Sequence, residues 1–296
     1  MTAGGSHPAY RVYGPDHPLS PIVISIPHAG REYAPELIAA ARVPLTILRR
    51  LEDRHADALV TPLLAAGRHR IVMANAARAM IDLNRDHREI DPGMLKCVPH
   101  GVSFIASAKS RGGLGLIPRR LSGAGELWHG PLAFDEAQQR IETLHRPYHE
   151  AVAQALRQVR EQFGHAVLID LHSMPPLMNW AQVNWGAGPQ PRFVLGDRFG
   201  RSASSRLIAR AGDYLSGRGF CVSHNHPYPG NYILARHGNP DRDIHAIQVE
   251  VDRSLYLDAD MDGTGPGLAR CQQLITGMVE AVEQLWPRSD FLQAAE

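Results

Sequence analysis

Six short apolar runs with helix-like segments between them constrain the fold of this 296-residue chain more than any other feature. The runs are rich in β-branched residues and have the length of buried strands. They lie at residues 21–26, 70–74, 166–171, 192–195, 220–223 and 246–251. Helix-like segments lie at about 45–66, 135–162, 199–217 and 265–285. This alternation predicts an α/β fold with a mixed, largely parallel central sheet flanked by helices.

The composition bears on which partners to expect. The chain is 44% hydrophobic and 21% charged, and its formal net charge is +1. This balance gives no general reason to expect nucleic acid or an anionic membrane as a partner. No run approaches the roughly 18 apolar residues of a membrane span. Because the chain also begins without a signal-peptide pattern and has three well-separated cysteines, we expect a cytoplasmic protein.

Residues 91–133 differ from the rest of the chain. They are glycine-rich, basic and without steady periodicity. Irregular segments of this length in compact domains are usually functional or mobile. Since no stretch has the composition of a linker, we expect one domain over residues 1–296, with a long irregular excursion at about 91–133.

Two of the predicted strands end near a histidine. His28 follows the first strand in PIVISIPHAG, and His172 lies near the end of the strand in HAVLIDLHSM. Ligands of open α/β sheets bind at this carboxyl edge. Asp170 lies two residues before His172, so both side chains leave the same face of the strand, and a carboxylate there could orient a ligating imidazole. Each histidine could instead be a strand-end residue with a satisfied hydrogen bond.

The segment LEDRHAD, residues 51–57, offers a carboxylate to complete a metal site. Two histidines and one carboxylate on separate elements are the minimum set for a hydrolytic zinc site with an open position. Asp53 and His55 are the candidates in this segment. The same cluster could also be a solvated helix face.

Cationic residues occur in ARAMIDLNRD, residues 77–86. The adjacent Asn84 and Arg85 combine an amide with a planar guanidinium, which together can bind a carboxylate through several hydrogen bonds. Arg78 is separate from that pair and could polarise a carbonyl and hold an oxyanion. All three could also be ordinary surface residues.

The last predicted strand contains a glutamate in an apolar setting. Gln248 and Glu250 share one face of IHAIQVEV, and three apolar residues occupy the other face. A charged residue in such a strand is rarely buried without a partner or a task. Glu250 is therefore a candidate general base for a hydrolase. The alternative is an edge strand with a solvated polar face.

An ordered set of motifs resembles the N-formylglutamate amidohydrolase family over roughly residues 20–285. The set is SIPHAG, D-x-H, IDLNR, RPYH, DLHS, N-x-x-x-x-G and HAIQVEV. That family is itself similar to zinc carboxypeptidases and aspartoacylase. The resemblance implies a zinc-carboxypeptidase-like (phosphorylase/hydrolase-like) three-layer architecture. It also implies a metal-dependent amidohydrolase that cleaves an N-formyl or N-acyl acidic amino acid, such as N-formylglutamate, with Zn²⁺ as the expected ion.

The resemblance also implies metal ligands. His28 and His172 match the two histidine ligands of the family. The wider carboxypeptidase pattern is H-x-x-E, but its last position is arginine here and Glu32 is one residue out of register. The D-x-H motif favours Asp53 as the third ligand, with His55 as a further alternative.

The remaining roles follow from the same resemblance. Glu250 matches the catalytic glutamate, Arg78 the carbonyl-polarising arginine, and Asn84 with Arg85 the residues that hold the substrate carboxylate. We expect a small-molecule carboxylate as the substrate.

Two other functions fit parts of this pattern. A catalytically silent protein could use the arginines to bind a carboxylate, and a carboxypeptidase-like peptidase could use the same metal site. Glu250 disfavours the silent binder, because a carboxylate that faces a bound anion weakens binding through like-charge repulsion.

Overall fold

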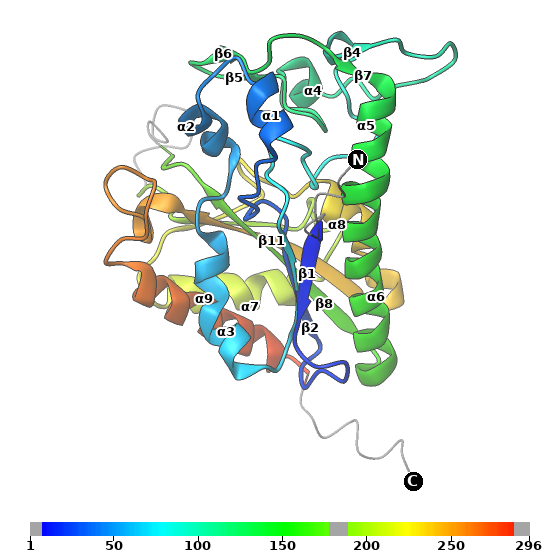
Figure 1. Ribbon diagram of the computed structural model, residues 1–296. Helices are drawn as coiled ribbons and strands as arrows, with labels where there is room; N and C mark the ends of the chain where they lie inside the picture. Colours follow the sequence, from blue (N-terminus) through cyan, green and yellow to red (C-terminus); the bar gives the residue numbers. More distant parts are fainter. Residues whose placement is uncertain (1–7, 178–188, 287–296) are drawn as a thin grey trace. The chain divides into compact units, whose positions relative to one another are not determined.

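The computed structural model describes residues 8–177 and 189–286 (Figure 1). The first seven residues, part of the stretch judged to lack a signal-peptide pattern, lie outside the described residues. In the described chain, the largest sheet has seven strands in the order β1-β3-β2-β8-β11-β9-β10. These strands are β1 (Tyr10–Tyr13), β2 (Ile22–Ile26), β3 (Arg70–Ala74), β8 (Ala166–Met174), β9 (Phe193–Gly196), β10 (Val222–His224) and β11 (Ile244–Asp252).

The pairing of the strands confirms the predicted mixed, largely parallel sheet. β8 pairs in parallel with β2 on one side and with β11 on the other. β9 runs antiparallel to β11 and parallel to β10. Every residue of β2 and β8 is buried, as expected for strands covered on both faces.

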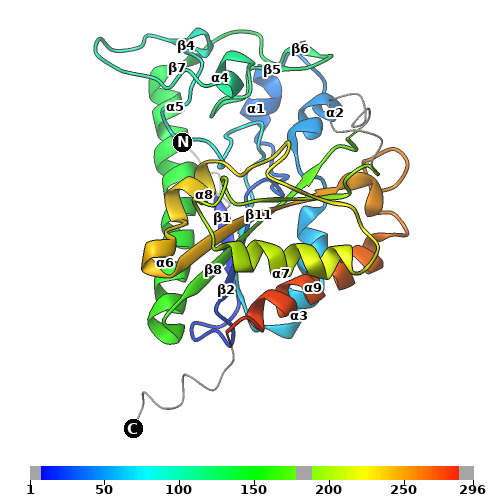
Figure 2. The same cartoon turned by 180° about the vertical axis from the view of Figure 1, so that it is seen from behind.

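Helices flank this sheet on both sides. α6 (Arg146–Phe163) lies on one side, and α7 (Ser205–Ser216), α9 (Leu268–Glu283) and the short α3 (Thr61–Ala66) lie on the other (Figures 1 and 2). α7 and α9 are side by side in both views. The remaining α-helices of the described chain are α1 (Pro35–Ala40), α2 (Leu45–Leu48), α4 (Ala108–Arg111), α5 (Phe134–Arg140) and α8 (Tyr232–His237).

The helix-like segment predicted at about 45–66 is not one continuous helix. The segment contains α2, two 3₁₀ turns (Arg49–Leu51 and Ala56–Val60) and α3, with an irregular break at residues 52–55. His55 has a left-handed backbone (φ 54°), which an α-helix cannot contain. Pro62 lies in the first turn of α3, where its missing N–H is tolerated. The predicted helix at 199–217 likewise begins later, at Ser205.

The chain divides into two compact units. One comprises Met1–Arg11, Pro27–Asp53 and Val72–Ala151. It contains residues 91–133, in which α4 and the short strands β4 (Leu95–Lys96), β5 (Arg120–Leu121), β6 (Gly125–Glu126) and β7 (Leu132–Ala133) occur. The other unit comprises Val12–Ile26, Arg54–Ile71 and Val152–Glu296. The single domain over residues 1–296 stays a prediction.

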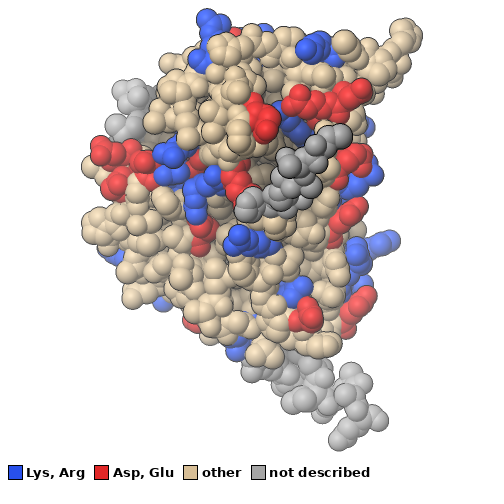
Figure 3. All heavy atoms as spheres, in the orientation of Figure 1, with Lys and Arg blue, Asp and Glu red and all other residues tan. Residues whose placement is uncertain are grey.

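None of the helices in the described residues combines the length and apolarity that a membrane span requires. On the face shown in Figure 3, acidic and basic side chains are interspersed, in keeping with the net charge of +1.

Candidate active site

The ladder between β8 and β11 places His172 beside Glu250. The two residues are register partners on parallel strands, and Asp170 is the partner of Gln248 in the same ladder. Register partners on adjacent strands project from the same face, so the four side chains share one face of the sheet. Both His172 and Glu250 are buried. The strands themselves therefore fix the direction of both side chains.

Asp170 connects His172 to a third strand. One carboxylate oxygen, Oδ2, lies 2.8 Å from His172 Nε2, and the other accepts a 2.8 Å hydrogen bond from the hydroxyl of Ser25 on β2. Both oxygens of the buried carboxylate are thus engaged. This arrangement orients the imidazole through Nε2, so Nδ1 is the nitrogen with which the ring would coordinate a metal.

Glu250 lies in the interior of the sheet. β11 is flanked by β8 and β9, so the alternative interpretation as an edge strand with a solvated face is wrong. Gln248 Nε2 donates a 2.9 Å hydrogen bond to Glu250 Oε1. Glu250 is 7% exposed, and this amide helps to stabilise its buried carboxylate.

His28 and Asp53 are joined by backbone and side chain. The backbone N–H of Asp53 donates to the carbonyl of His28 at 3.0 Å. Asp53 Oδ2 lies 3.4 Å from His28 Nδ1, and both residues are buried. The break in the predicted 45–66 helix is therefore what allows Asp53 to lie beside His28.

Asp82 is a residue of the site that the sequence interpretation missed. Its Oδ1 accepts hydrogen bonds from His28 Nε2 at 2.7 Å and from the backbone N–H of Asn84 at 2.9 Å. Asp82 therefore does for His28 what Asp170 does for His172. The IDLNR motif contains Asp82, and the need for a carboxylate behind each ligating histidine was the signal that could have found it.

The charge of Asp82 is stabilised by its neighbours. Arg78 binds its Oδ2 through both Nε (2.9 Å) and Nη2 (2.8 Å). Burial by itself would raise the pKa of the Asp82 carboxyl, but Arg78, His28 and Arg85 hold that pKa well below its usual range. Arg78 Nη1 lies 3.4 Å from the carbonyl of Leu51. The guanidinium of Arg78 is thus held by a planar two-bond ion pair.

Asn84 and Arg85 lie in a segment without helix or strand, residues 77–86, which we call the 77–86 loop. Both are buried. Arg85 donates through Nε to the carbonyl of Leu114 (3.0 Å) and through Nη1 to that of Asn84 (2.9 Å). Within the described residues, Nη2 of Arg85 donates to no acceptor. Two of the three guanidinium nitrogens are thus held by backbone carbonyls.

One group of possible metal ligands is present among the described residues. His28, Asp53 and His172 each offer a ligand atom, and these atoms lie within 4.8 Å of one another. Two imidazoles and one carboxylate are a donor set of catalytic zinc sites. Each imidazole also has a carboxylate on its Nε2, as ligating histidines usually do. The residues present therefore fit a divalent metal such as Zn²⁺.

The two alternative third ligands lie outside this group. The backbone N–H of Glu32 donates to the carbonyl of Asn75 at 3.1 Å, and its side chain is not part of the cluster. His55 Nε2 donates to the carbonyl of Asp262 at 2.9 Å. The structure thus brings Asp53, and neither of the alternatives, to the two histidines.

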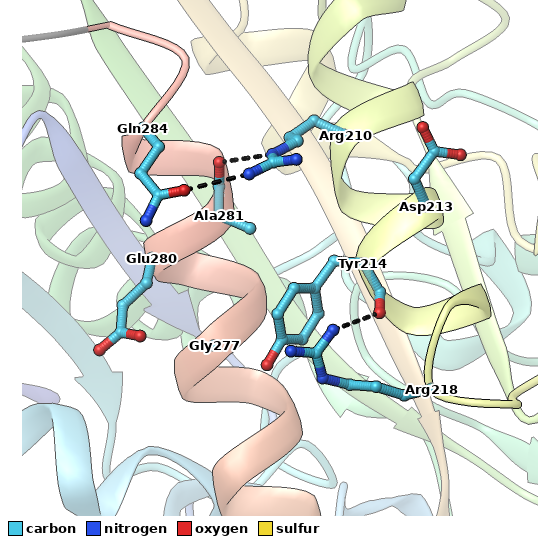
Figure 4. A pocket seen from close by; sticks show the side chains of 8 residues that line it. All are labelled: Arg210, Asp213, Tyr214, Arg218, Gly277, Glu280, Ala281 and Gln284. Carbon is cyan, nitrogen blue, oxygen red and sulfur yellow. Dashed lines mark hydrogen bonds between the residues drawn. The ribbon is translucent and has the colours of Figure 1, made fainter.

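A pocket of about 490 Å³ lies elsewhere, between α7 and α9 (Figure 4). Arg210 donates there to the carbonyl of Ala281 and to Gln284 Oε1, which joins the two helices. A Cβ at Gly277 would lie 1.7 Å from the hydroxyl of Tyr214, so a larger residue at this crossing would displace that side chain. None of the candidate site residues lines this pocket.

Comparisons with known proteins bear on the identity of this site. The family model of N-formylglutamate amidohydrolase matches residues 20–257. The chain is 30% identical over 250 residues to the N-formylglutamate deformylase of Pseudomonas putida, a match that covers 80% of this chain and 82% of that protein. The N-formylglutamate deformylase of Pseudomonas aeruginosa is 27% identical over 252 residues, with the same 80% and 82% covered.

Solved structures show the same likeness. The crystal structure of N-formylglutamate amidohydrolase from Ralstonia eutropha JMP134 superposes with a TM-score of 0.85 at 29% identity, covering 94% of this chain and 98% of that chain. A protein from Agrobacterium tumefaciens shares the fold, with a TM-score of 0.66 at 17% identity and 94% and 96% of the two chains covered.

Proposed function

Because this chain belongs to the N-formylglutamate amidohydrolase family, we propose that it is a zinc-dependent enzyme that removes formate from an N-formyl acidic amino acid such as N-formyl-L-glutamate. The observation that carries this proposal is the cluster of His28, Asp53 and His172. This reaction requires a site held by regular secondary structure, such as the carboxyl ends of strands, with each ligating histidine oriented by a carboxylate.

His28, Asp53 and His172 are the proposed ligands, and Asp82 and Asp170 orient the two imidazoles. When bound, the metal supplies Lewis-acid chemistry and a nucleophilic water at neutral pH. The protein contributes three ligands, which leaves a position for water or substrate.

Glu250 is the proposed general base. It takes a proton from the attacking water and delivers it to the leaving amine of the amino acid. Its position beside His172 in the β8–β11 ladder supports this role, because the strand fixes the carboxylate next to a proposed ligand. The amide of Gln248 holds one carboxylate oxygen and orients the other.

Arg78 is proposed to stabilise the oxyanion that forms at the formyl carbon. Loss of one such donor typically costs about 3 kcal/mol of transition-state stabilisation. The ion pair with Asp82 supports this role by fixing the plane of the guanidinium.

Asn84 and Arg85 are proposed to bind the α-carboxylate of the substrate. Arg85 is held by its Nε and Nη1, so the Nη2 side can donate to a carboxylate without rearrangement of the loop.

The test is metal analysis of the purified protein followed by a formate-release assay on a panel of N-formyl amino acids. We expect about one equivalent of zinc per chain and fastest release from N-formyl-L-glutamate. Binding without formate release would favour a silent carboxylate-binding protein, and cleavage of peptides would favour a peptidase. A cytoplasmic location is part of the proposal, and fractionation of cells tests it.

A further inference from the structure

The continuous helical segment formed by α5, a π-helical turn and α6 makes three side-chain hydrogen bonds to the backbone of the 77–86 loop. Arg140 at the end of α5 donates through Nη1 to the carbonyl of Met80 at 3.0 Å. His149 in α6 bonds the carbonyl of Leu83 through Nε2 at 3.0 Å, and His145 bonds that of Arg85 at 2.8 Å. The three acceptors belong to the stretch from Met80 to Arg85, which also contains Asp82 and Asn84.

A π-helical turn puts these side chains on one face. The turn covers Ile141–His145 and joins α5 to α6 without interruption. In a regular α-helix, residues five positions apart point in different directions, since each residue rotates by about 100°. The wider i→i+5 turn brings Arg140 and His145 onto the same side. His149 follows four positions later and continues that face.

Both histidines are buried and make specific contacts. His145 is 3% exposed, His149 is fully buried, and their ring centroids are 4.4 Å apart. A carbonyl oxygen only accepts hydrogen bonds, so Nε2 of each ring carries the hydrogen. Loss of either ring would leave a backbone carbonyl unsatisfied in the interior. His149 is also the histidine of the RPYH motif, to which neither the sequence interpretation nor the proposed mechanism gives a role.

We propose that His145 and His149 are positioning residues for substrate recognition: they fix the backbone of Leu83–Arg85, so that Asn84 and Arg85 are held in the geometry that binds the substrate carboxylate. The inference rests on the proposed function. The histidines act only through the loop, so their loss affects recognition of the carboxylate more than the chemical step.

The chain offers matched variants for a test. His149→Leu removes the donor to Leu83, whereas His149→Gln keeps an N–H at a similar distance from the helix. Tyr148→Phe is the control, since the Tyr148 hydroxyl lies 3.5 Å from the carbonyl of Val72 on β3, outside the loop. His145→Leu and His145→Gln form a second pair, directed at the carbonyl of Arg85.

The zinc-loaded variants are compared on N-formyl-L-glutamate and on its α-carboxamide. We expect His149→Leu to raise KM for the carboxylate substrate by about tenfold to a hundredfold, because small misplacements of binding groups have effects of this size. The kcat and the KM for the α-carboxamide should change far less. His149→Gln should restore most of the loss, and Tyr148→Phe should resemble the wild type.

Hydrogen exchange gives a readout that does not depend on catalysis. The backbone N–H groups of Asn84 and Arg85 are bonded to Asp82. Faster exchange of these amides in His149→Leu, with protection restored in His149→Gln, would support the anchoring role. If His149→Leu exchanges like the wild type, or raises KM equally for both substrates, the inference is wrong. A wild-type protein that releases no formate would instead refute the proposed function, whatever the exchange data show. Should His149→Leu not fold, the His145 pair decides by the same criteria.

Discussion

His172 and Glu250 lie on two strands of a backbone ladder. Arg78, Asn84 and Arg85 lie instead in an irregular loop whose shape depends on side-chain contacts. In the ladder, backbone hydrogen bonds between β8 and β11 define the position of each Cα, and the pleat defines the direction of each side chain. In the 77–86 loop, the geometry depends on the ion pair between Arg78 and Asp82 within the loop. It also depends on two backbone carbonyls of the loop that accept hydrogen bonds from His145 and His149.

This difference predicts different responses to substitution. A side chain on a central strand can be changed without moving its neighbours, so its loss removes one function at a time. A side chain in the loop takes part in several contacts, so its loss changes the positions of others as well.

The largest effect is expected for His172→Ala on the ladder. Circular dichroism should show that the fold is retained, because the strand keeps its backbone pairing. Bound zinc should fall well below one equivalent per chain, and activity should be lost. The control is His55→Ala, whose ring bonds the carbonyl of Asp262 and should leave the metal content unchanged. Full metal occupancy in His172→Ala would place the metal elsewhere.

Glu250→Gln should lower kcat by about 10²–10⁴, the usual contribution of a positioned acid–base group. The amide keeps the size of the side chain but cannot accept the proton, so metal content and KM should be retained. Steady-state kinetics with metal analysis measure both. If kcat stays within about tenfold of the wild type, Glu250 is not the general base. If metal is lost together with activity, Glu250 is a ligand.

Asp170→Asn and Asp82→Asn compare the two regions directly. Both should weaken zinc binding by about 10–100-fold, because each carboxylate orients a proposed ligand. At saturating zinc, Asp170→Asn should have a near-normal KM. Asp82→Asn should raise KM, because an uncharged amide nitrogen replaces the Oδ2 that pairs with the guanidinium of Arg78. Chelator competition and kinetics at saturating zinc provide the two measurements. Identical kinetic profiles would show that Asp82 does not couple the metal site to the loop.

Arg85→Lys should have the smallest effect, confined to the carboxylate. Lysine keeps the charge but lacks the planar guanidinium, so KM for N-formyl-L-glutamate should rise by about tenfold, the effect of losing roughly 1.4 kcal/mol of binding. The KM for the α-carboxamide should be nearly unchanged. Equal changes for both substrates would contradict a contact between Arg85 and the carboxylate.

The strands are where sequence patterns were most informative. Each of the six apolar runs overlaps a strand of the large sheet, and the alternation in IHAIQVEV correctly placed Gln248 and Glu250 on one face. The pair Asp170 and His172 followed from the same two-residue period. The helix-like segment at about 45–66 is interrupted at residues 52–55, where the Asp53 N–H bonds the distant His28 carbonyl instead of a carbonyl of the same helix.

The sequence by itself thus determined which segments form buried strands, because continuous apolar runs mark them. It also determined which side chains leave the same face of a strand, because their direction alternates with a period of two residues. Only the tertiary structure decided that Asp82 binds His28, 54 residues away, and that a π-helical turn brings His145 and His149 to the 77–86 loop. Side-chain hydrogen bonds between distant segments leave no periodic trace in the sequence. They form only once the packing of the chain has placed donor and acceptor within about 3 Å of each other.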